Sequence, residues 1–582
     1  MGSLFYLNKY FKRYKSLIFL GIIFILISNI AQVYIPLLLK DTIDALQNNL
    51  SKDLITEYAV LIVLAAIISG IFRFLIRQTI IVVSWKIEYD IRQDFWSHIQ
   101  RLPLRFFQNN STGNIMAHAT NDISAVRMYV GPAVMYSIDT ITKFIIVLAI
   151  MISLSASLTF YSLIPLPILS YFVYKLSKKI HKKFTLIQEK FSELTTKAQE
   201  NFSGIRVIKS YVREQNEVDD FSRLSSDYLK RTMEKVKIQA LFMPLLYLIT
   251  GVSIIVVILV GGNMVINGTF TLGGLAAFIS YLGLLIWPTI AFGWVANIIQ
   301  QADASMKRLH NILNEQYEIE DTSETNNSIE SIKGDIEFEN VTFQYRDNLP
   351  KVLDNITLKI PRGSSMAVIG HTGEGKTTLV NLISRLYDVT GGSIKIDGNP
   401  IKTIPLKVLR KEIGSVPQET FLFSDTLANN ILYGVKEKDM DLVRKVSSIA
   451  KLDKDVESFP NSYETILGER GITLSGGQKQ RACLARALAI DPNILILDDS
   501  FSAVDTNTEE EILNDLRVFM RGRTSIIISH RISTVKNADN IIVLNEGKIA
   551  EQGTHEELVN LGGIYADLHF KQLLEEELKE LG

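Results

Sequence analysis

The run from Leu17 to Leu39 contains no charged residue, and it constrains the fold of this chain more than any other stretch. A helix of this length spans about 30 Å of hydrocarbon, so the run predicts a transmembrane helix. Five further apolar runs follow before the middle of the chain, at roughly Tyr58–Val83, Ala133–Leu154, Leu158–Tyr174, Leu241–Ile266 and Leu272–Ile290. We therefore expect six transmembrane helices, in a membrane domain that covers residues 1–314.

Positive charge predicts the orientation of these helices. Lys9, Lys12 and Arg13 precede the first run, and cytoplasmic segments of membrane proteins carry an excess of Lys and Arg. The amino terminus is therefore expected to be cytoplasmic. The long, basic segments between the second and third runs and between the fourth and fifth runs then lie on the same side, as does the second half of the chain.

The two long cytoplasmic segments are predicted to be helical extensions of the membrane spans. Each is interrupted near its middle, at residues 107–113 in the first segment and 201–204 in the second. A short amphipathic piece follows each interruption and offers a docking point for a soluble domain. A solvated coiled-coil hairpin is the alternative interpretation.

The second half of the chain has a different pattern. Residues 315–335 are rich in Glu, Ser, Asn and Asp and are predicted to form a linker. From Ile336 onward, short strand patterns alternate with turns and helices, which is typical of an α/β domain. We expect this domain to cover residues 336–570, followed by a charged tail at 571–582.

Charge and cysteine content exclude some functions. The chain has 61 Lys and Arg residues against 62 Asp and Glu residues, a net charge of −1, which argues against a nucleic-acid partner. Cys483 is the only cysteine, so neither an intrachain disulfide nor a cysteine-ligated zinc site can form. We expect Cys483 to be a core residue and not a reactive thiol.

Residues 370–378 read Gly-His-Thr-Gly-Glu-Gly-Lys-Thr-Thr and fit the pattern G-x-x-x-x-G-K-[ST]. An apolar strand pattern precedes them and a helix pattern follows, as this phosphate-binding loop requires. Backbone N–H groups and the positive end of the helix dipole bind phosphate oxygens, while Lys376 reaches the β- and γ-phosphates and Thr377 holds Mg²⁺. The expected ATP-binding residues of this loop are Gly370, His371, Thr372, Gly373, Glu374, Gly375, Lys376, Thr377 and Thr378.

Residues 494–498 form a continuous apolar run that ends in Asp498, as in a buried parallel strand. An aspartate at the carboxyl end of such a strand is placed to hold Mg²⁺ beside the phosphate loop, usually through water. Together with Lys376 and Thr377, Asp498 predicts an ATPase or a related nucleoside triphosphatase.

Residues 474–481, Leu-Ser-Gly-Gly-Gln-Lys-Gln-Arg, resemble the signature motif of ATP-binding cassette (ABC) proteins. Tyr345 resembles the aromatic residue that stacks on adenine, and Gln418 the glutamine that senses Mg²⁺ and the membrane domain. Residues 502–505 resemble the loop that links two ATP sites, and His530 the residue that senses the γ-phosphate. The resemblance covers essentially the whole chain, which is similar to a bacterial-type ABC exporter half-transporter.

The resemblance implies a multidomain protein of the plasma membrane. Its six-helix membrane domain, with long cytoplasmic extensions, precedes an α/β P-loop nucleotide-binding domain. Two such chains would pair, with each ATP held between the phosphate loop of one chain and the signature motif of the other. Residues 112–122 and 204–209 would be the coupling helices. The implied signature residues are Leu474, Ser475, Gly476, Gly477 and Gln478. The implied catalytic residues are Asp499, His530 and Gln418, and the implied Mg²⁺-binding residues are Thr377, Gln418 and Asp498.

One residue departs from the family pattern. After Asp498 the family has a glutamate that activates the attacking water, whereas this chain has Asp499, whose carboxylate sits about 1.5 Å further back. The site built on Lys376 is therefore expected to bind ATP and hydrolyse it slowly. This departure resembles the degenerate-site subunit of heterodimeric multidrug exporters. A homodimer in which aspartate suffices is the alternative.

The substrate is less constrained by the sequence. Charged residues in or beside the spans are a functional hypothesis by default, and here they are Arg73, Arg77, Asp139 and Lys143. Asp139 and Lys143 also have the spacing of an ion pair on one helix, and the two arginines have the length to extend toward the interface. We expect export of amphipathic drug-like molecules first and lipids second. A nucleotide-gated channel or switch on the same fold is the alternative function.

Overall fold

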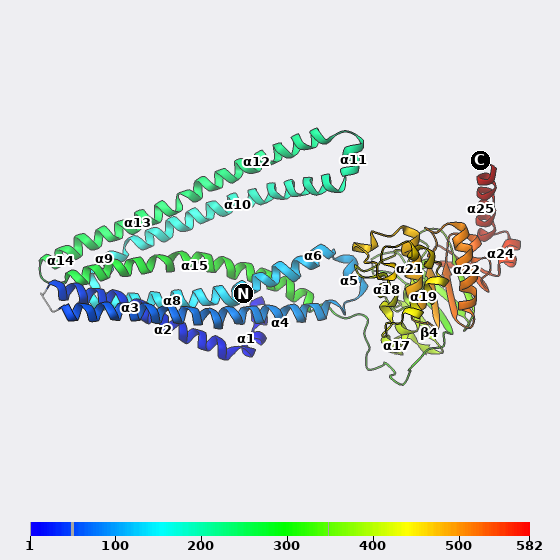
Figure 1. The fold of residues 1–582 in the computed structure, drawn as a ribbon, viewed down its shortest axis with the longest axis horizontal. Coiled ribbons are helices and arrows are strands. Elements are labelled where there is room, and N and C mark those ends of the chain that lie inside the picture. The colour runs from blue at the N-terminus through cyan, green and yellow to red at the C-terminus, as the bar shows by residue number, and fades with distance from the viewer. Residues whose placement is uncertain (1, 48–51, 347, 582) are drawn as a thin grey trace. The chain divides into compact units, whose positions relative to one another are not determined.

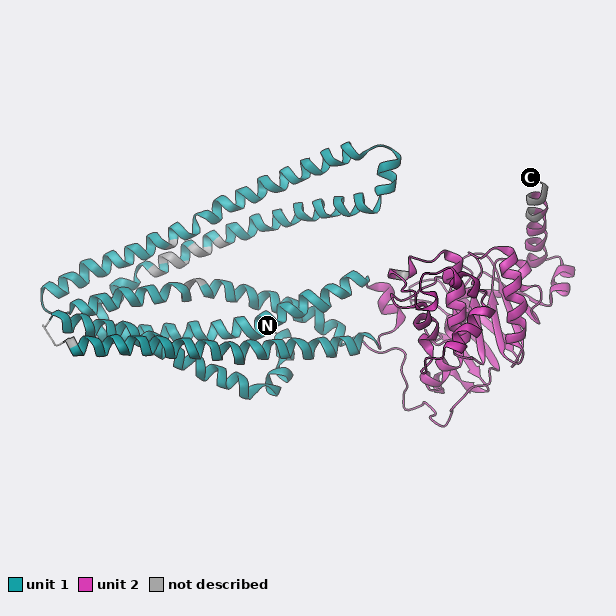
Figure 2. Cartoon of the chain, viewed as in Figure 1, with its two compact units in different colours: residues 1–100, 111–315 teal, residues 101–110, 316–582 magenta. Residues whose placement is uncertain are grey.

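The computed structural model describes residues 2–47, 52–346 and 348–581. The chain divides into two compact units (Figures 1 and 2). The first comprises residues 1–100 and 111–315, and the second comprises residues 101–110 and 316–582. The short helix α5 (Leu104–Asn109) therefore belongs to the second unit, although it lies within the first third of the sequence.

Helices are the only regular secondary structure among the described residues of the first unit. Its longer helices are α2 (Lys15–Gln47), α3 (Lys52–Ile76), α4 (Val82–Ile99), α8 (Val134–Leu154), α10 (Pro165–Ser203), α12 (Glu214–Ala240), α13 (Phe242–Val256) and α15 (Leu272–Leu313). Its shorter helices are α1 (Asn8–Arg13), α6 (Thr112–Ala117), α7 (Ile123–Met128), α9 (Ala156–Leu163), α11 (Ile205–Ser210) and α14 (Gly262–Ile266). π-helical turns interrupt this series at Arg77–Ile81, His118–Asp122, Tyr129–Ala133 and Val257–Gly261.

Five helical stretches within the described residues are long and apolar enough to cross a membrane. They are Lys15–Gln47, Asp53–Ile99, Thr112–Leu154, Glu214–Ile266 and Leu272–Leu313. The remaining expected span, residues 158–174, is helical in α9 and α10, but several of its side chains lie outside the described residues. The count of six spans therefore stays a prediction.

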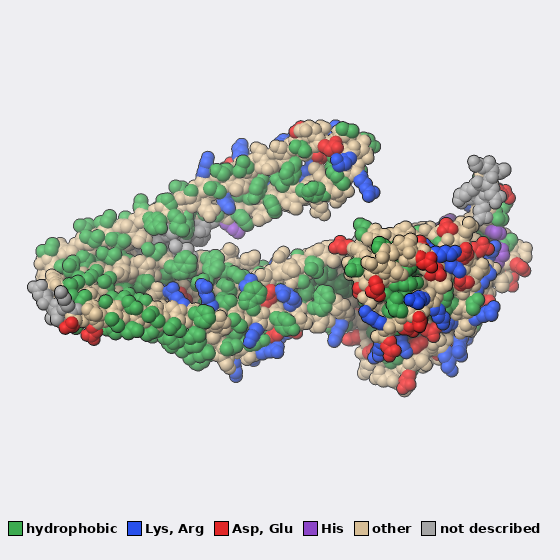
Figure 3. Space-filling view, viewed as in Figure 1, with side chains coloured by type: hydrophobic (Ala, Val, Ile, Leu, Met, Phe, Trp, Pro, Cys, Tyr) green, Lys and Arg blue, Asp and Glu red, His purple; other side chains and the backbone are tan. Residues whose placement is uncertain are grey.

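The surface of the first unit suits a hydrocarbon environment. Along α3, the exposed side chains Val60, Val63, Ile67 and Ile71 follow the spacing of one helix face. Figure 3 shows hydrophobic side chains over much of the visible face of this unit, whereas charged side chains gather on the second unit. An apolar face of this extent is unfavourable in water and favourable in lipid.

Polar side chains connect the helices inside the first unit. The Asn29 side chain of α2 donates to the carbonyl oxygen of Asp139 at 3.1 Å and to the hydroxyl of Thr142 at 2.7 Å, both on α8. The fully buried Tyr281 of α15 donates its hydroxyl proton to the carbonyl of Val33 on α2 at 2.9 Å. In an apolar medium such hydrogen bonds help to fix how neighbouring helices meet.

The helices break at both places where the sequence predicts interruptions. α5 ends at Asn109 and α6 begins at Thr112, where the Ser111 hydroxyl accepts a hydrogen bond from the backbone of Asn114. α10 ends at Ser203, and α11 follows after Gly204. α10 and α12 run side by side as a hairpin (Figure 1), joined by ion pairs such as Lys183–Glu234.

The second unit contains two sheets. The first is antiparallel, with strand order β2-β1-β4-β5, and consists of β1 (Ile336–Phe343), β2 (Leu353–Ile360), β4 (Gly391–Ile396) and β5 (Asn399–Pro400). The second has the order β10-β9-β3-β8-β7-β6 and consists of β3 (Ser365–Ile369), β6 (Ile413–Val416), β7 (Ile494–Asp498), β8 (Thr524–Ile528), β9 (Asn540–Asn545) and β10 (Lys548–Gly553). All its pairings are parallel except that of β9 with β10.

The helices of the second unit after α5 pack around these sheets. They are α16 (Lys376–Ile383), α17 (Leu406–Lys411), α18 (Leu427–Ile431), α19 (Met440–Ile449), α20 (Asp453–Glu457), α21 (Gly476–Ala489), α22 (Thr506–Met520), α23 (Ile532–Val535), α24 (His555–Leu561) and α25 (Ile564–Leu581). β7 and β8 are buried along their whole length, which explains why they appear in the sequence as continuous apolar runs.

Candidate nucleotide-binding site

The phosphate-loop residues connect β3 to α16, as the sequence predicts. Gly373 and Gly375 have φ angles of +95° and +91°, a region in which a side chain is strained. A Cβ atom on Gly375 would also lie 2.9 Å from the carbonyl oxygen of Val352. Glycine at these two positions therefore allows the loop to turn tightly in front of the amino-terminal end of α16.

A cavity of about 300 Å³ lies in front of this loop. Its lining residues come from the phosphate loop and from segments that are distant in the sequence. They are Tyr345, Val352, Thr372, Gly373, Gly375, Lys376, Thr377, Thr378, Gln418, Asp498, Asp499, Ile528 and His530. The parallel sheet explains this convergence, because β3, β7 and β8 end at the same edge.

Lys376 and Tyr345 are held by specific contacts. The Lys376 ammonium group donates to the carbonyl oxygens of Gly370 and His371 at 2.8 and 2.7 Å. The Tyr345 and Thr378 hydroxyl groups share a hydrogen bond at 2.9 Å.

Gly370, His371 and Glu374 are expected ATP-binding residues that do not line the cavity.

Burial sets the electrostatics of the site. Burial lowers the pKa of Lys376, although the nearby carboxylates of Asp498 and Asp499 partly oppose the shift. Burial also raises the pKa of Asp498, and the neighbouring Asp499 adds to the increase, while a hydrogen bond from Thr377 opposes it. A ligand of opposite charge would therefore stabilise the charged form of each side chain.

The donor set fits Mg²⁺. Asp498, Thr377 and Gln418 offer oxygen ligands at one cavity, and a magnesium ion usually binds one or two carboxylates together with substrate phosphates. Among the described residues, no group of three or more His, Cys, Asp or Glu side chains could hold a metal ion by itself. With one carboxylate among its three residues, the donor set fits a cation that also binds substrate phosphates.

Asp499 follows β7 in a left-handed backbone conformation, with φ at +49°. Its amide donates to the carbonyl of Ile528 at 2.9 Å. Aspartate adopts this conformation more readily than most side chains, because its short polar side chain bonds locally. The sequence gives no sign of this backbone conformation.

The signature motif lies apart from this cavity. Ser475 caps the start of α21, where its side chain and that of Gln478 form reciprocal hydrogen bonds with the backbone. Leu474, Ser475, Gly476, Gly477 and Gln478 are not among the residues that line the cavity in the described part of the chain.

Two glutamines contact the site loops, and the sequence interpretation did not single them out. Gln480 of α21 is buried, donates to the Ser502 hydroxyl at 2.9 Å and accepts from the amide of Ala503 at 2.9 Å. Gln572 of α25 donates to the carbonyl of His530 at 2.5 Å and accepts from the amide of Ile532 at 2.8 Å. Gln480 could have been found because it lies within the signature run, whereas no local signal marks Gln572.

Replacing Gln572 by alanine is expected to loosen the loop that carries His530. The amide of Ile532 loses its acceptor, so hydrogen exchange in residues 529–535 should accelerate by about tenfold. Peptide-resolved exchange followed by mass spectrometry measures this. Lys571→Ala is the matched control, because Lys571 pairs with Asp567 on its own helix. Equal exchange in both variants would show that Gln572 does not hold the loop.

Cys483 lies in the core, as predicted, with 3% of its surface exposed. Burial raises the pKa of its thiol, which reduces the reactive thiolate. We expect iodoacetamide at neutral pH to label less than about one tenth of the folded protein. Complete labelling should follow denaturation, and rapid labelling of the native protein would contradict this placement.

Comparisons with known proteins agree with this architecture. Residues 18–289 match the family described as ABC transporter transmembrane region, and residues 353–502 match the one described as ABC transporter. A multidrug resistance-like ATP-binding protein MdlA of Buchnera aphidicola subsp. Schizaphis graminum is 36% identical over 580 residues, which are 99% of this chain and 98% of the relative. An ATP-dependent lipid A-core flippase of Desulfotalea psychrophila is 36% identical over 544 residues, covering 93% and 94%.

A solved structure shares the fold. The structure of a bacterial Atm1-family ABC exporter with ATP bound matches with a TM-score of 0.79 at 24% identity, and the match covers 96% of this chain and 98% of that one. The predicted order of a helical membrane region followed by an ABC nucleotide-binding domain is therefore confirmed.

Proposed function

Because this chain belongs to the ABC transporter family, we propose that it exports amphipathic small molecules, drug-like compounds or lipids, across the plasma membrane by alternating access. It is an ATPase whose activity is coupled to transport, and a multi-pass membrane protein. The names of its relatives support the substrate class, since they include a multidrug resistance-like protein and a lipid A-core flippase.

One observation carries the proposal. A single cavity of the second unit combines the phosphate loop with Asp498, Gln418 and His530, in a chain whose first unit has apolar helices of membrane-spanning length. A soluble nucleoside triphosphatase does not need such helices, and a passive membrane protein does not need such a cavity. Transport driven by ATP requires both.

Seven of the cavity residues have a proposed role. Lys376 binds the β- and γ-phosphates, and Tyr345 stacks on adenine. Thr377, Asp498 and Gln418 hold Mg²⁺, which neutralises phosphate charge when bound. Asp499 orients the attacking water, and His530 contacts the γ-phosphate.

We propose that a second half-transporter completes the site. Its signature motif would face this chain's phosphate loop, while residues 474–478 of this chain would face the partner's loop. ATP then favours the closed pair, and hydrolysis removes that preference. Asp499 supports a heterodimer with one slow and one competent site, and a homodimeric lipid exporter is the alternative.

We further propose six membrane spans, with the amino terminus and the nucleotide-binding domain in the cytoplasm. The basic residues before the first span support this orientation. Residues 112–122 and 204–209 would act as the coupling helices that pass closure of the nucleotide-binding domains to the spans.

Transport in proteoliposomes tests the function. The purified complex is reconstituted, Mg²⁺ and ATP are added outside, and uptake of a fluorescent amphiphile is followed against its gradient. Uphill uptake that stops with a non-hydrolysable ATP analogue supports a pump. Downhill flux that continues at fixed nucleotide would instead indicate a channel or switch.

A further inference from the structure

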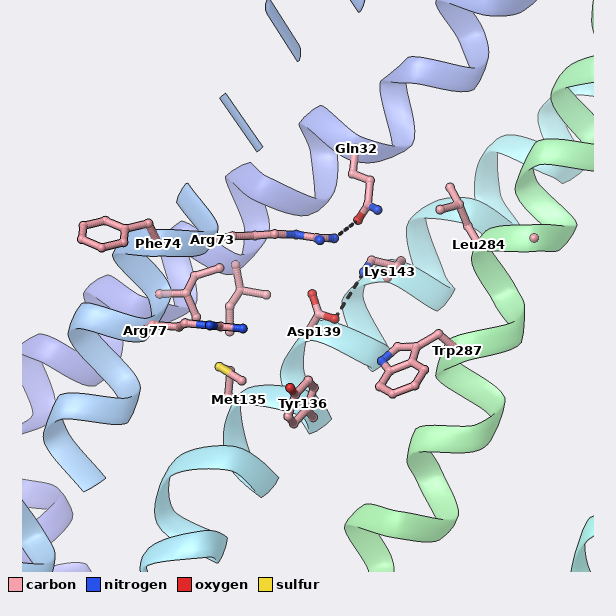
Figure 4. Close-up of a pocket in the computed structure, with 13 residues that line it drawn as sticks. Gln32, Arg73, Phe74, Arg77, Met135, Tyr136, Asp139, Lys143, Leu284 and Trp287 are labelled. Carbon is pink, nitrogen blue, oxygen red and sulfur yellow. Dashed lines mark hydrogen bonds and ion pairs between the residues drawn. The ribbon is translucent and has the colours of Figure 1, made fainter. Parts of the chain in front are cut away.

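A second cavity, of about 660 Å³, lies within the first unit. α2, α3 with the following π-helical turn, α8 and α15 form its walls (Figure 4). Its lining residues combine apolar side chains with four charged ones. They are Ile25, Gln32, Arg73, Phe74, Ile76, Arg77, Met135, Tyr136, Asp139, Lys143, Gly283, Leu284 and Trp287. The volume lies within the range of small-molecule sites.

The charged side chains of this cavity carry more positive than negative charge. Lys143 pairs with Asp139 at 3.3 Å, as their spacing on one helix predicts. Asp139 is the only carboxylate among the described residues that line the cavity, so this pair uses the negative charge that those residues supply. Two arginines remain, and in Figure 4 Arg77 extends toward α8 whereas Arg73 ends at Gln32 of α2.

Neither arginine pairs with a carboxylate among the described residues. Arg73 donates to the side-chain oxygen of Gln32 on α2 at 2.7 Å, which is a neutral acceptor. Among the described residues that line the cavity, Figure 4 shows no hydrogen bond or ion pair that joins Arg77 to an acidic side chain. Arg77 also begins a π-helical turn, Arg77–Ile81, and such turns are frequent at functional sites.

The surroundings make this excess of positive charge unfavourable without a ligand. α2, α3 and α8 lie in stretches of membrane-spanning length and composition, where an unpaired charge is costly. Apolar groups, including Phe74, Leu284 and Trp287, line the same cavity. An anion would pair with the guanidinium groups while its apolar part contacts these side chains.

We propose that this cavity binds the anionic group of an amphipathic substrate, with Arg73 and Arg77 holding a carboxylate, sulfonate or phosphate. Guanidinium groups suit these oxyanions, because their planar donors match two acceptor oxygens at once. The apolar part of the substrate packs against Leu284 and Trp287. The inference rests on the proposed export function and narrows its substrate class to amphipathic anions.

A cation would be a poorer ligand for this cavity. It would approach two arginines, and the carboxylate of Asp139, the only one among the described lining residues, is already paired with Lys143. Repulsion between like charges in a medium of low dielectric constant opposes its binding. The cavity should therefore discriminate by charge between molecules of equal apolar length.

Fluorescence quenching by brominated amphiphiles tests the proposal. Trp287 lines the cavity, and bromine quenches tryptophan at short range. The complex, in a neutral detergent and without nucleotide, is titrated with an ω-brominated decyl sulfonate and with the trimethylammonium compound of the same chain length. A Trp287→Phe variant identifies the signal, because the chain has four tryptophans. The sulfonate is expected to quench at a concentration about tenfold lower than the cation.

Variants of matched charge complete the test. Arg73→Gln/Arg77→Gln should raise the half-saturating sulfonate concentration by about tenfold or more. The control variant Arg213→Gln/Arg223→Gln, at exposed positions of α12 and its amino-terminal flank, should leave that concentration unchanged. An unchanged thermal unfolding midpoint excludes misfolding as the cause. Equal quenching by sulfonate and cation, or an unchanged sulfonate titration in the Arg73/Arg77 variant, would overturn the proposal.

A third experiment identifies the source of the anion, which is either a lipid headgroup or a soluble amphiphile. Brominated phosphatidylglycerol in nanodiscs replaces the sulfonate, and quenching that depends on Arg73 and Arg77 there assigns a lipid headgroup. Quenching by the sulfonate alone assigns a soluble amphiphile. Because no nucleotide is present, failure of anion binding leaves the export proposal standing if uphill transport of a neutral or cationic amphiphile is observed.

Discussion

An Asp499→Glu substitution is expected to raise the rate of ATP hydrolysis at this chain's own site by about 100-fold. Asp499 lines the same cavity as Lys376 and His530. We therefore expect the length of its side chain, and not its location, to limit the rate. Glutamate carries its carboxylate one methylene further, and a misplacement of about 1 Å costs on the order of 100-fold in rate. The substitution therefore moves the carboxylate closer to the attacking water.

Single-turnover hydrolysis measures this effect, with the complex in excess over labelled ATP and the partner's competent site inactivated by replacing its catalytic glutamate with glutamine. Asp499→Asn is the matched control, since it keeps the size of aspartate, removes the charge and should lower the residual rate. The left-handed backbone at residue 499 limits the gain, because glutamate fits it less well than aspartate by about 1 kcal/mol. A rate for Asp499→Glu equal to that of the natural chain would show that aspartate already suffices.

The signature motif of this chain is expected to matter more for steady-state ATPase activity than its phosphate loop. In the proposed heterodimer, residues 474–478 would complete the partner's competent site, while Lys376 would serve the slow site. Gly476→Asp should lower the activity by about 100-fold or more, because its carboxylate would face the partner's γ-phosphate. Lys376→Ala should lower it by less than about tenfold.

A second variant separates the effect of side-chain size at residue 476 on ATPase activity from the effect of charge. A Cβ atom there lies 3.3 Å from the Cβ of Ala503, so any side chain is crowded. Gly476→Asn has nearly the same size as Gly476→Asp without its charge and should retain more activity. If Lys376→Ala and Gly476→Asp abolish activity equally, the two sites are equivalent and the asymmetric account fails.

Local patterns predicted the parts of the site that lie next to one another in the sequence. The strand before the phosphate loop, helix α16 after it and the buried strand that ends at Asp498 are present as expected. These elements follow from apolar runs and from glycines, which act over a few residues. The Asp139–Lys143 pair was predictable for the same reason, since both residues lie on one helix.

Contacts between distant segments were not predictable. Gln572 contacts the His530 loop from α25, and nothing near residue 572 in the sequence indicates this. The length of Arg73 allows it to extend toward the membrane interface, but the sequence did not indicate that its guanidinium group bonds to Gln32 on α2. That contact depends on how two helices are rotated against each other, which an apolar run does not specify.

The central claim is that this chain is one half of an asymmetric ATP-driven exporter. The most direct measurement is the intact mass of the complex, extracted in mild detergent from its native membranes. We expect two species of similar size, the second carrying glutamate at the position that corresponds to Asp499. A complex that contains only this chain and hydrolyses ATP at a full rate would contradict the claim.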